Sequence, residues 1–233
     1  VFCSAPPGAG WLPRRAATTW VGQPGRPHDQ QPTMITTLFS LLLGLQLLLP
    51  QLFDQALSAS RQGRFDEALP LWNQVLEVAP GDAAAWSNRG NVQLALGDPR
   101  AAIADQTKAM QLDGESPDPH LNRGTAEEAL GQWAAAEADY RWILERAPSD
   151  EGEPRASALY NLGNVQGSLG DWQEARLCFE AASLARPGFA MARSSAALAA
   201  FQLGDRAEAE RQLRNLIRRY PLFADARAGL TAL

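Results

Sequence analysis

Three asparagines recur along this chain at similar intervals, and their side chains are suited to binding chemistry. Asn88, Asn122 and Asn161 are separated by 34 and 39 residues. An asparagine amide offers a donor and an acceptor, which match the C=O and N–H groups of a peptide backbone. Asparagine is unfavourable in a helix interior by roughly a few tenths of a kcal/mol relative to alanine, so its recurrence calls for a reason. On successive helices, the three side chains can hold an extended chain with little regard for its sequence.

Residues able to carry out catalysis are not assembled in the sequence. The histidines are His28 and His120, and the repeats described below hold no second histidine that would complete a metal-binding pair. Gly8-Ala-Gly10 precedes neither a strand nor a helix, and no glycine-rich loop ends in Gly-Lys-Ser/Thr. His120 stands where another repeat carries a tryptophan, which favours a packing role. We predict no catalytic residue, no metal site and no cofactor.

Glycines at a fixed interval reveal the elements that must position the asparagines. Each glycine is followed five residues later by an alanine, and the intervals between the glycines are 34, 34, 39 and 34 residues. A period near 34 indicates a stack of repeated helical hairpins, and therefore an all-α solenoid. The glycines are Gly63, Gly97, Gly131, Gly170 and Gly204, and the alanines are Ala68, Ala102, Ala136, Ala175 and Ala209.

With the glycine counted as residue 15, the repeat units are 49–82, 83–116, 117–150, 156–189 and 190–223. The glycine suits the left-handed residue that ends a first helix. The second helix then begins at an N-cap, such as Asp98 before Pro99, or Asp171 and Asp205 with a glutamate three residues later. These signals predict two helices in every unit.

Small residues at position 8 and larger ones at position 24 predict how each hairpin closes. Small side chains let the two helices approach, whereas a large residue would overpack the contact. Repeat 2 departs from the pattern, because it has Gln106 at position 24 and Gly114 where other units have proline. Position 8 holds Ala56, Gly90, Gly124, Gly163 and Ala197, and position 24 otherwise holds Trp72, Tyr140, Phe179 and Leu213.

This pattern resembles the tetratricopeptide repeat (TPR) family over residues 49–223. The resemblance implies a right-handed superhelical α-solenoid of antiparallel helix pairs, with five repeats and a capping helix at 224–233. The matching residues are Trp86, Gly90, Gly97, Ala102 and Ala109 in repeat 2, and Leu159, Leu162, Gly163, Gly170, Trp172, Ala175, Phe179, Ala182 and Pro187 in repeat 4.

The same resemblance implies that first helices line a concave groove that binds a protein or an extended peptide. The asparagines then stand at position 6 and resemble the asparagine ladder of some family members; the alternative is that their amides bond to the neighbouring repeat. The predicted groove residues are Ser87, Asn88, Asn91, Asp118, Leu121, Asn122, Thr125, Glu128, Tyr160, Asn161, Asn164, Ser194 and Ser195.

One specialisation of the family is excluded by the residues present. Chaperone-binding members grip a C-terminal carboxylate with lysines and an arginine at positions 2, 5 and 6. Those cations are absent here, so we predict no clamp for acidic chaperone tails. The positions hold Ala84, Ser87, Asp118, Leu121, Ser157 and Tyr160 beside the asparagines.

The region before the repeats has two parts. Residues 1–33 are rich in Pro, Gly, Gln and Arg, which predicts a disordered leader, and Met34 is a candidate for the true start. Residues 34–48 are uncharged and apolar. Three interpretations stand: an uncleaved membrane anchor through 35–53, a cleaved export signal, or an amphipathic helix packed on the stack. Membrane association is the first expectation, and export to a periplasm or thylakoid lumen is the alternative.

Charge and insertions add three expectations. The net charge of −5 argues against a nucleic-acid role. Arg211, Arg214, Arg218 and Arg219 have helical spacing and can face an acidic partner or lipid phosphates; a solvated face beside Glu208 and Glu210 is the alternative. Residues 151–155 are an insertion, predicted to lengthen the turn between repeats 3 and 4.

Together these observations predict a non-catalytic scaffold or assembly factor that holds a partner protein, at a membrane. A targeting or regulatory subunit of an enzyme complex is the alternative.

Overall fold

The computed structural model describes residues 34–146 and 152–232, and of residues 34–47 it describes the backbone alone. The chain divides into two compact units, 1–42 and 43–233. The predicted leader 1–33 lies outside the described residues. In the first unit only the helical residues 34–42 are described, so the contacts below belong to the second unit.

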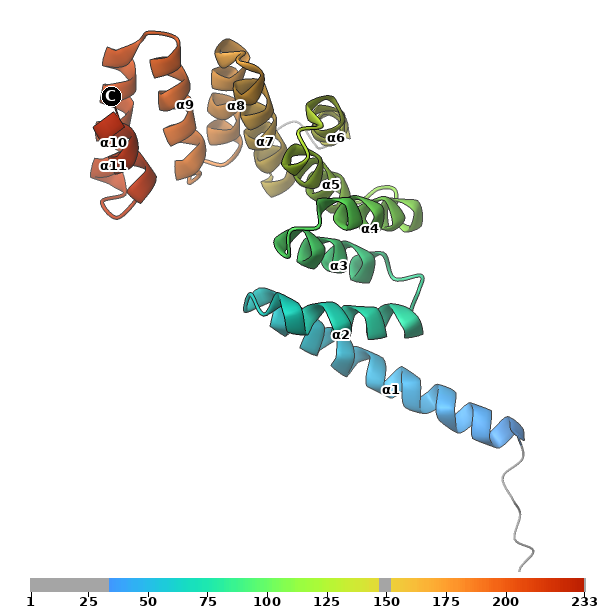
Figure 1. The fold of residues 1–233 in the computed structure, drawn as a ribbon. Coiled ribbons are helices and arrows are strands. Elements are labelled where there is room, and N and C mark those ends of the chain that lie inside the picture. Colours follow the sequence, from blue (N-terminus) through green and yellow to red (C-terminus); the bar gives the residue numbers. More distant parts are fainter. Residues whose placement is uncertain (1–33, 147–151, 233) are drawn as a thin grey trace, which may run out of the picture. The chain divides into compact units, whose positions relative to one another are not determined.

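The described residues form eleven helices and no strand, which confirms the all-α solenoid. Ten helices pair into five hairpins, and the eleventh follows the last hairpin (Figure 1). The helices are α1 (Met34–Arg61), α2 (Phe65–Val78), α3 (Ala83–Ala95), α4 (Pro99–Leu112), α5 (Pro117–Ala129), α6 (Trp133–Arg146), α7 (Glu153–Leu169), α8 (Trp172–Ala185), α9 (Ala190–Gln202), α10 (Arg206–Arg219) and α11 (Ala224–Ala232).

Packing follows the order of the chain, because each helix from α2 onward contacts the next one. First helices also contact one another along the stack, α3 with α5, α5 with α7, and α9 with α11. The first helices α3, α5 and α7 therefore form one continuous layer, which carries most of the predicted groove residues.

The predicted hairpin signals are confirmed by the backbone. All five repeat glycines have positive φ, from 69° at Gly131 to 88° at Gly204. Asp98 accepts a hydrogen bond from the Ala101 N–H at 3.0 Å, and Asp171 accepts one from the Glu174 N–H at 3.1 Å. The N-caps satisfy backbone donors that the helix leaves free.

Close approach at position 8 is also confirmed. A Cβ added at Gly124 would lie 2.6 Å from the Tyr140 ring, and one added at Gly163 would lie 2.6 Å from the Phe179 ring. Real Cβ atoms essentially never come so close. In repeats 3 and 4 the aromatic residue of the second helix therefore packs directly against the glycine of the first helix.

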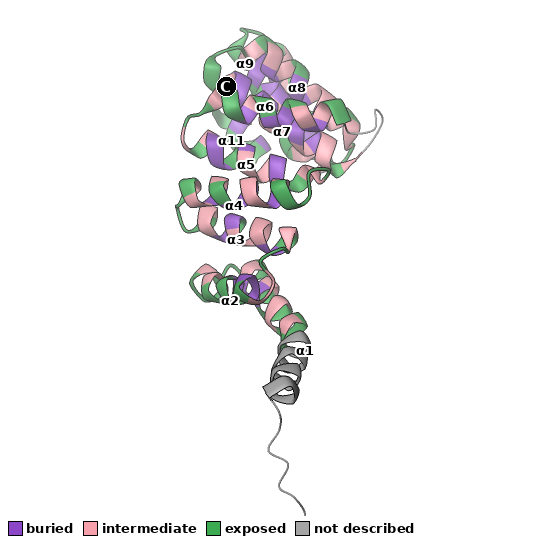
Figure 2. Ribbon diagram, turned by 90° about the vertical axis from the view of Figure 1, so that its right-hand side faces the viewer, coloured by how far each residue is buried: buried purple, intermediate pink, exposed green. Residues whose placement is uncertain are grey.

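The core lies between successive helices, and the ribbon of Figure 2 marks the buried residues in purple. In the first hairpin Trp72 is fully buried and meets Phe53 edge-on, with ring centroids 5.0 Å apart. Phe53 belongs to α1, which is one continuous helix from Met34 to Arg61. None of the described helices has the length and hydropathy required to cross a membrane.

The structure differs from the sequence expectation at the insertion. Glu153, Pro154 and Arg155 form the first turn of α7, which has 17 residues. Three residues of the insertion therefore belong to a helix, because proline is well tolerated in a first helical turn. Glu153 forms an ion pair with Arg186 of the next loop. The rest of the turn, 147–151, lies outside the described residues.

Candidate functional site

A polar hollow of ≈ 350 Å³ lies on first helices α3 and α5. It brings together five predicted groove residues: Ser87, Asn88, Asn91, Asp118 and Asn122. Its lining carries two carboxylates and no lysine or arginine. The other lining residues are Ala83, Ala84, Asp113, Ser116 and Pro119.

Two asparagines of the row each donate one N–H to an acceptor within the protein. The Asn88 amide donates to the carbonyl of Ala84 in its own helix at 2.9 Å. The Asn122 amide donates to Ser87 Oγ of the preceding repeat at 3.3 Å. Hydrogen bonding to the neighbouring repeat is therefore present at Asn122. Each amide has a second N–H and a carbonyl oxygen, and no partner for them occurs among the described residues.

Gln106 of α4 explains why repeat 2 lacks an aromatic residue at position 24. Its buried amide donates to the Ser87 carbonyl at 2.9 Å and to Asn91 Oδ1 at 3.0 Å. The Gln106 side chain therefore bonds to two residues that line the hollow, and it orients the Asn91 amide. Sequence reasoning noted Gln106 as a departure without assigning it this contact.

Asn161, the third asparagine of the row, belongs to a separate cluster around Tyr140. The Tyr140 hydroxyl donates to the Glu128 carboxylate, and the Asn161 side chain lies near the same hydroxyl. Burial raises the pKa of both Tyr140 and Glu128. Thr125 Oγ1 lies 3.5 Å from the same hydroxyl. Because Tyr140 is buried, its hydrogen bond ties Glu128 to the core of repeat 3.

The remaining predicted residues divide between surface and core. Leu121 and Tyr160 are half-buried, and Tyr160 packs on Phe189 with ring centroids 5.0 Å apart. Ser194 is only 3% exposed, so it lies in the core rather than on the groove surface.

A second hollow of ≈ 440 Å³ contains the predicted residues Asn164 and Ser195 on α7 and α9. Trp172, Phe179 and Leu198 give it an apolar lining. The structure thus places the predicted groove residues mainly around two hollows of different character. The other lining residues are Gly163, Gly167, Ser168 and Gln202.

Sequence reasoning missed two ion pairs, each between a partly exposed arginine and a buried aspartate. The Arg89 guanidinium donates to both carboxylate oxygens of Asp105, at 2.7 and 2.8 Å. Arg123 does the same to Asp139, at 2.7 and 2.8 Å. Forked pairs of this kind fix orientation as well as charge. The signal was present, because arginine at position 7 recurs with aspartate at position 23 in repeats 2 and 3.

Each of these arginines also reaches the preceding repeat. Arg89 Nη1 donates to Asn73 at 2.9 Å, and Arg123 Nη1 donates to Thr107 at 3.3 Å. We call each arginine with its acceptors an arginine strut. It connects the first helix of a repeat to the second helix of the same repeat and to the second helix of the preceding repeat.

The strut of repeat 3 holds a larger polar cluster. His120 Nδ1 lies 2.8 Å from Asp139 Oδ1, and the imidazole stacks on Trp142 with centroids 3.7 Å apart. His120 is 6% exposed. The histidine is therefore a packed and hydrogen-bonded core residue, as its place in the repeat predicted.

Glu127 gives this cluster a pH dependence that can be measured. Burial, and next the Asp139 carboxylate, raise the pKa of Glu127 to about 7. A carboxyl whose pKa is higher in the native state than in the unfolded chain contributes most stability below its unfolded value of 4.5. That contribution is lost as pH rises through 4.5 to about 7. The free energy of unfolding of Glu127→Gln, measured relative to wild type, is therefore expected to rise by on the order of 1–3 kcal/mol from pH 5 to pH 8.

Urea unfolding of wild type and Glu127→Gln at both pH values measures this gain. An equal stability difference at pH 5 and pH 8 would contradict the assignment.

Stacked helical hairpins with hollows on their first helices are typical of repeat proteins that bind other proteins or peptides. Two family models, both described as tetratricopeptide repeat, match residues 53–117, 160–221 and 194–230, and residues 116–183. The chain belongs to the tetratricopeptide repeat family. Members of this family bind peptides or partner proteins, and the fold is generally a non-catalytic interaction scaffold.

Similar proteins share the fold over limited lengths. The chain is 36% identical over 86 residues to the TPR repeat-containing thioredoxin TDX of Arabidopsis thaliana, which is 37% of this chain and 23% of that protein. It is 36% identical over 91 residues to Hsc70-interacting protein 1 of Drosophila melanogaster, and these residues are 39% of this chain and 24% of that protein. The chain thus spans about a quarter of the length of these relatives.

Two solved structures show the same fold. MamA is 24% identical, with 76% of this chain and 93% of that one covered and a TM-score of 0.60. A thermophilic TPR protein of Thermus thermophilus is 19% identical, with 79% and 97% covered and a TM-score of 0.65.

Proposed function

We propose that the chain is a non-catalytic scaffold or assembly factor that holds an extended segment of a partner protein along its first helices. One observation carries this proposal. The polar hollow gathers Ser87, Asn88, Asn91, Asp118 and Asn122 from two successive repeats. Side-chain amides and a hydroxyl are able to satisfy a peptide backbone, whose N–H and C=O groups must be paired when they leave water.

The lining also defines what the segment should contain. Asp113 and Asp118 repel an acidic segment and favour a neutral or basic one. In the apolar hollow, Trp172 and Leu198 can bury a hydrophobic side chain of the same segment. The partner segment is therefore extended, not acidic, and carries at least one apolar side chain.

Removing the amides is expected to abolish capture of the partner. Asn88→Ala/Asn122→Ala loses about 1 kcal/mol for each hydrogen bond, or roughly a 30-fold weaker affinity. Alanine favours a helix more than asparagine does, so the loss should not come from unfolding. The measurement is affinity capture from native membranes, followed by quantification of each recovered protein.

A matched control removes amides from second helices. Gln74→Ala/Gln111→Ala changes two exposed amides on α2 and α4. Its recovered proteins should equal those of wild type. An unchanged partner list for the asparagine variant would contradict binding at this hollow. Recovery of one stoichiometric enzyme would favour a targeting or regulatory subunit instead.

Membrane attachment through 35–53 is part of the same proposal. The continuity of α1 supports an uncleaved segment, because cleavage near Ser58 would remove Phe53 and Ala56 from the core against Trp72. Alkaline carbonate extraction of native membranes should leave the protein in the membrane pellet. Full release into the soluble fraction would contradict attachment and favour a packed helix.

A further inference from the structure

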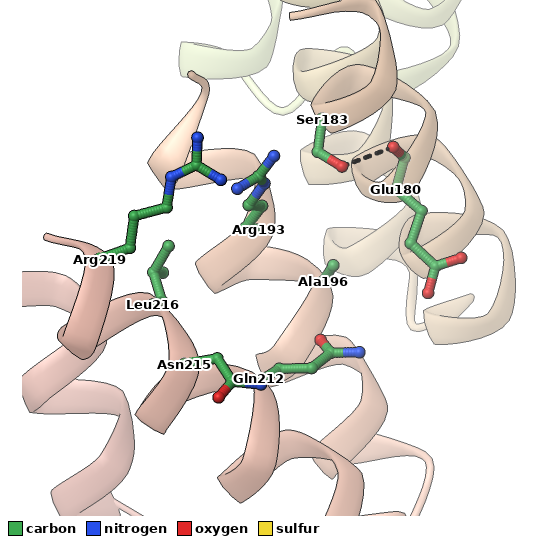
Figure 3. A pocket seen from close by; sticks show the side chains of 8 residues that line it. All are labelled: Glu180, Ser183, Arg193, Ala196, Gln212, Asn215, Leu216 and Arg219. Carbon is green, nitrogen blue, oxygen red and sulfur yellow. Dashed lines mark hydrogen bonds between the residues drawn. The ribbon is translucent and has the colours of Figure 1, made fainter. Parts of the chain in front are cut away.

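A third hollow, of ≈ 330 Å³, lies away from the groove, between second helices α8 and α10 (Figure 3). Helix α8 contributes Glu180 and Ser183 to one wall, and Ala196 of α9 lies between the walls. The other lining residues are Arg193, Gln212, Asn215, Leu216 and Arg219.

The hollow occupies the place that an arginine strut fills in repeats 2 and 3. In those repeats the position 7 arginine bridges an aspartate at position 23 and a polar residue at position 25 of the preceding repeat. The same three positions in repeat 5 are Ala196, Gln212 and Glu180. Because alanine replaces the arginine, the space is left open.

The charge around this space is positive. Arg193 and Arg219 extend toward the same end of the hollow (Figure 3), and neither forms an ion pair within the described part of the chain. The one acidic lining residue, Glu180, is already paired with Arg176 at 2.8 Å. On α10, by contrast, Arg211 and Arg214 are paired with Glu208 and Glu210. Two uncompensated guanidinium groups therefore dominate the hollow.

We propose that this hollow binds a phosphate group, supplied either as free phosphate or as a phosphate ester on a partner. Two guanidinium forks match the charge and the several acceptor oxygens of a phosphate, whereas one fork suffices for a carboxylate. The Asn215 amide on the same lining can donate to a remaining oxygen, whereas the Gln212 amide already donates to Glu208 at 2.6 Å. This site is independent of the peptide groove on α3 and α5.

Titration of the full chain with inorganic phosphate, O-phosphoserine and acetate at constant ionic strength tests this site. The readout is the shift of the arginine Nε–H resonances. We expect saturable shifts at Arg193 and Arg219 with both phosphates, and at least tenfold weaker binding of acetate. Tighter binding of phosphoserine than of inorganic phosphate would assign the site to a partner's phosphate ester, and the reverse order to free phosphate.

The variants separate a built site from general charge attraction. Arg193→Ala/Arg219→Ala should weaken phosphate binding at least tenfold, whereas Arg193→Lys/Arg219→Lys should retain part of it. Arg211→Ala/Arg214→Ala removes the same charge from the same region and should bind phosphate as wild type does. Equal weakening by both alanine pairs, equal binding of acetate, or no saturable shift would overturn the proposal.

Discussion

Replacing Asp139 by alanine is expected to lower the free energy of unfolding by about 3–5 kcal/mol, the usual cost of removing one partner of a buried ion pair. Asp139 is 3% exposed, accepts from the Arg123 guanidinium and lies within hydrogen-bond distance of His120. Its loss leaves a guanidinium and an imidazole half-buried or buried without their acceptor. Urea unfolding monitored by circular dichroism measures the change.

Repeat 4 provides the compensating residues for this prediction. There the positions of His120, Arg123 and Asp139 hold Leu159, Leu162 and Cys178, all buried. Exchanging a buried polar set for well-packed apolar residues is often neutral. His120→Leu/Arg123→Leu/Asp139→Cys should therefore recover most of the stability that Asp139→Ala loses. An exposed carboxylate, Glu77, serves as the control, because Glu77→Ala should change stability by less than about 0.5 kcal/mol. A small loss for Asp139→Ala would show that the pair is not formed.

The second large effect is expected at Gly163, where alanine should destabilise the protein by about 1–3 kcal/mol. The added methyl group would lie 2.6 and 2.7 Å from two carbons of the Phe179 ring. Both residues are within helices packed against each other, so the ring must shift into neighbouring core. The free energy of unfolding again gives the measurement.

Repeat 5 shows which second change should relieve this overpacking. It carries Ala197 and Leu213 at the positions of Gly163 and Phe179, and both are fully buried. Gly163→Ala/Phe179→Leu is therefore expected to lose less free energy of unfolding than the two single variants lose together. Additive effects in the double-mutant cycle would contradict a direct contact. Gly188→Ala is a suitable control, because a Cβ at this glycine would meet nothing within 4 Å.

The sequence was sufficient for features that depend on neighbours along the chain. The glycine interval, the N-cap aspartates and the pairing of Gly163 with Phe179 all follow from positions counted within one repeat. The arginine struts were not predicted, although arginine and aspartate recur at positions 7 and 23 of repeats 2 and 3. The contacts to Asn73 and Thr107 depend on the distance between helices of different repeats, which position counting within one repeat does not give. For the same reason Ser194 was assigned to the groove: its position in the repeat is a surface position, but the packing of α9 buries it.

Division of the groove into two hollows also could not be read from residue types. Counting assigned Asn161 to the same row as Asn88 and Asn122. In the structure Asn161 lies near the Tyr140 hydroxyl, which donates to Glu128, and it does not line the polar hollow that contains Asn88 and Asn122. Which side chain lies beside each asparagine depends on the three-dimensional packing of neighbouring repeats, and residue types alone do not reveal it.

The arginine struts make the junctions between repeats chemically unequal. Repeats 1 to 3 are joined through Arg89 and Arg123, whereas the corresponding position is Leu162 in repeat 4 and Ala196 in repeat 5. The stability of a repeat array is close to a sum of repeat and junction energies. Salt weakens contacts between partly exposed charges, and cooling weakens apolar burial. Added salt should therefore loosen the array from its N-terminal end, and cooling should loosen it from its C-terminal end. The end of the array that unfolds first thus depends on whether salt or low temperature destabilises it.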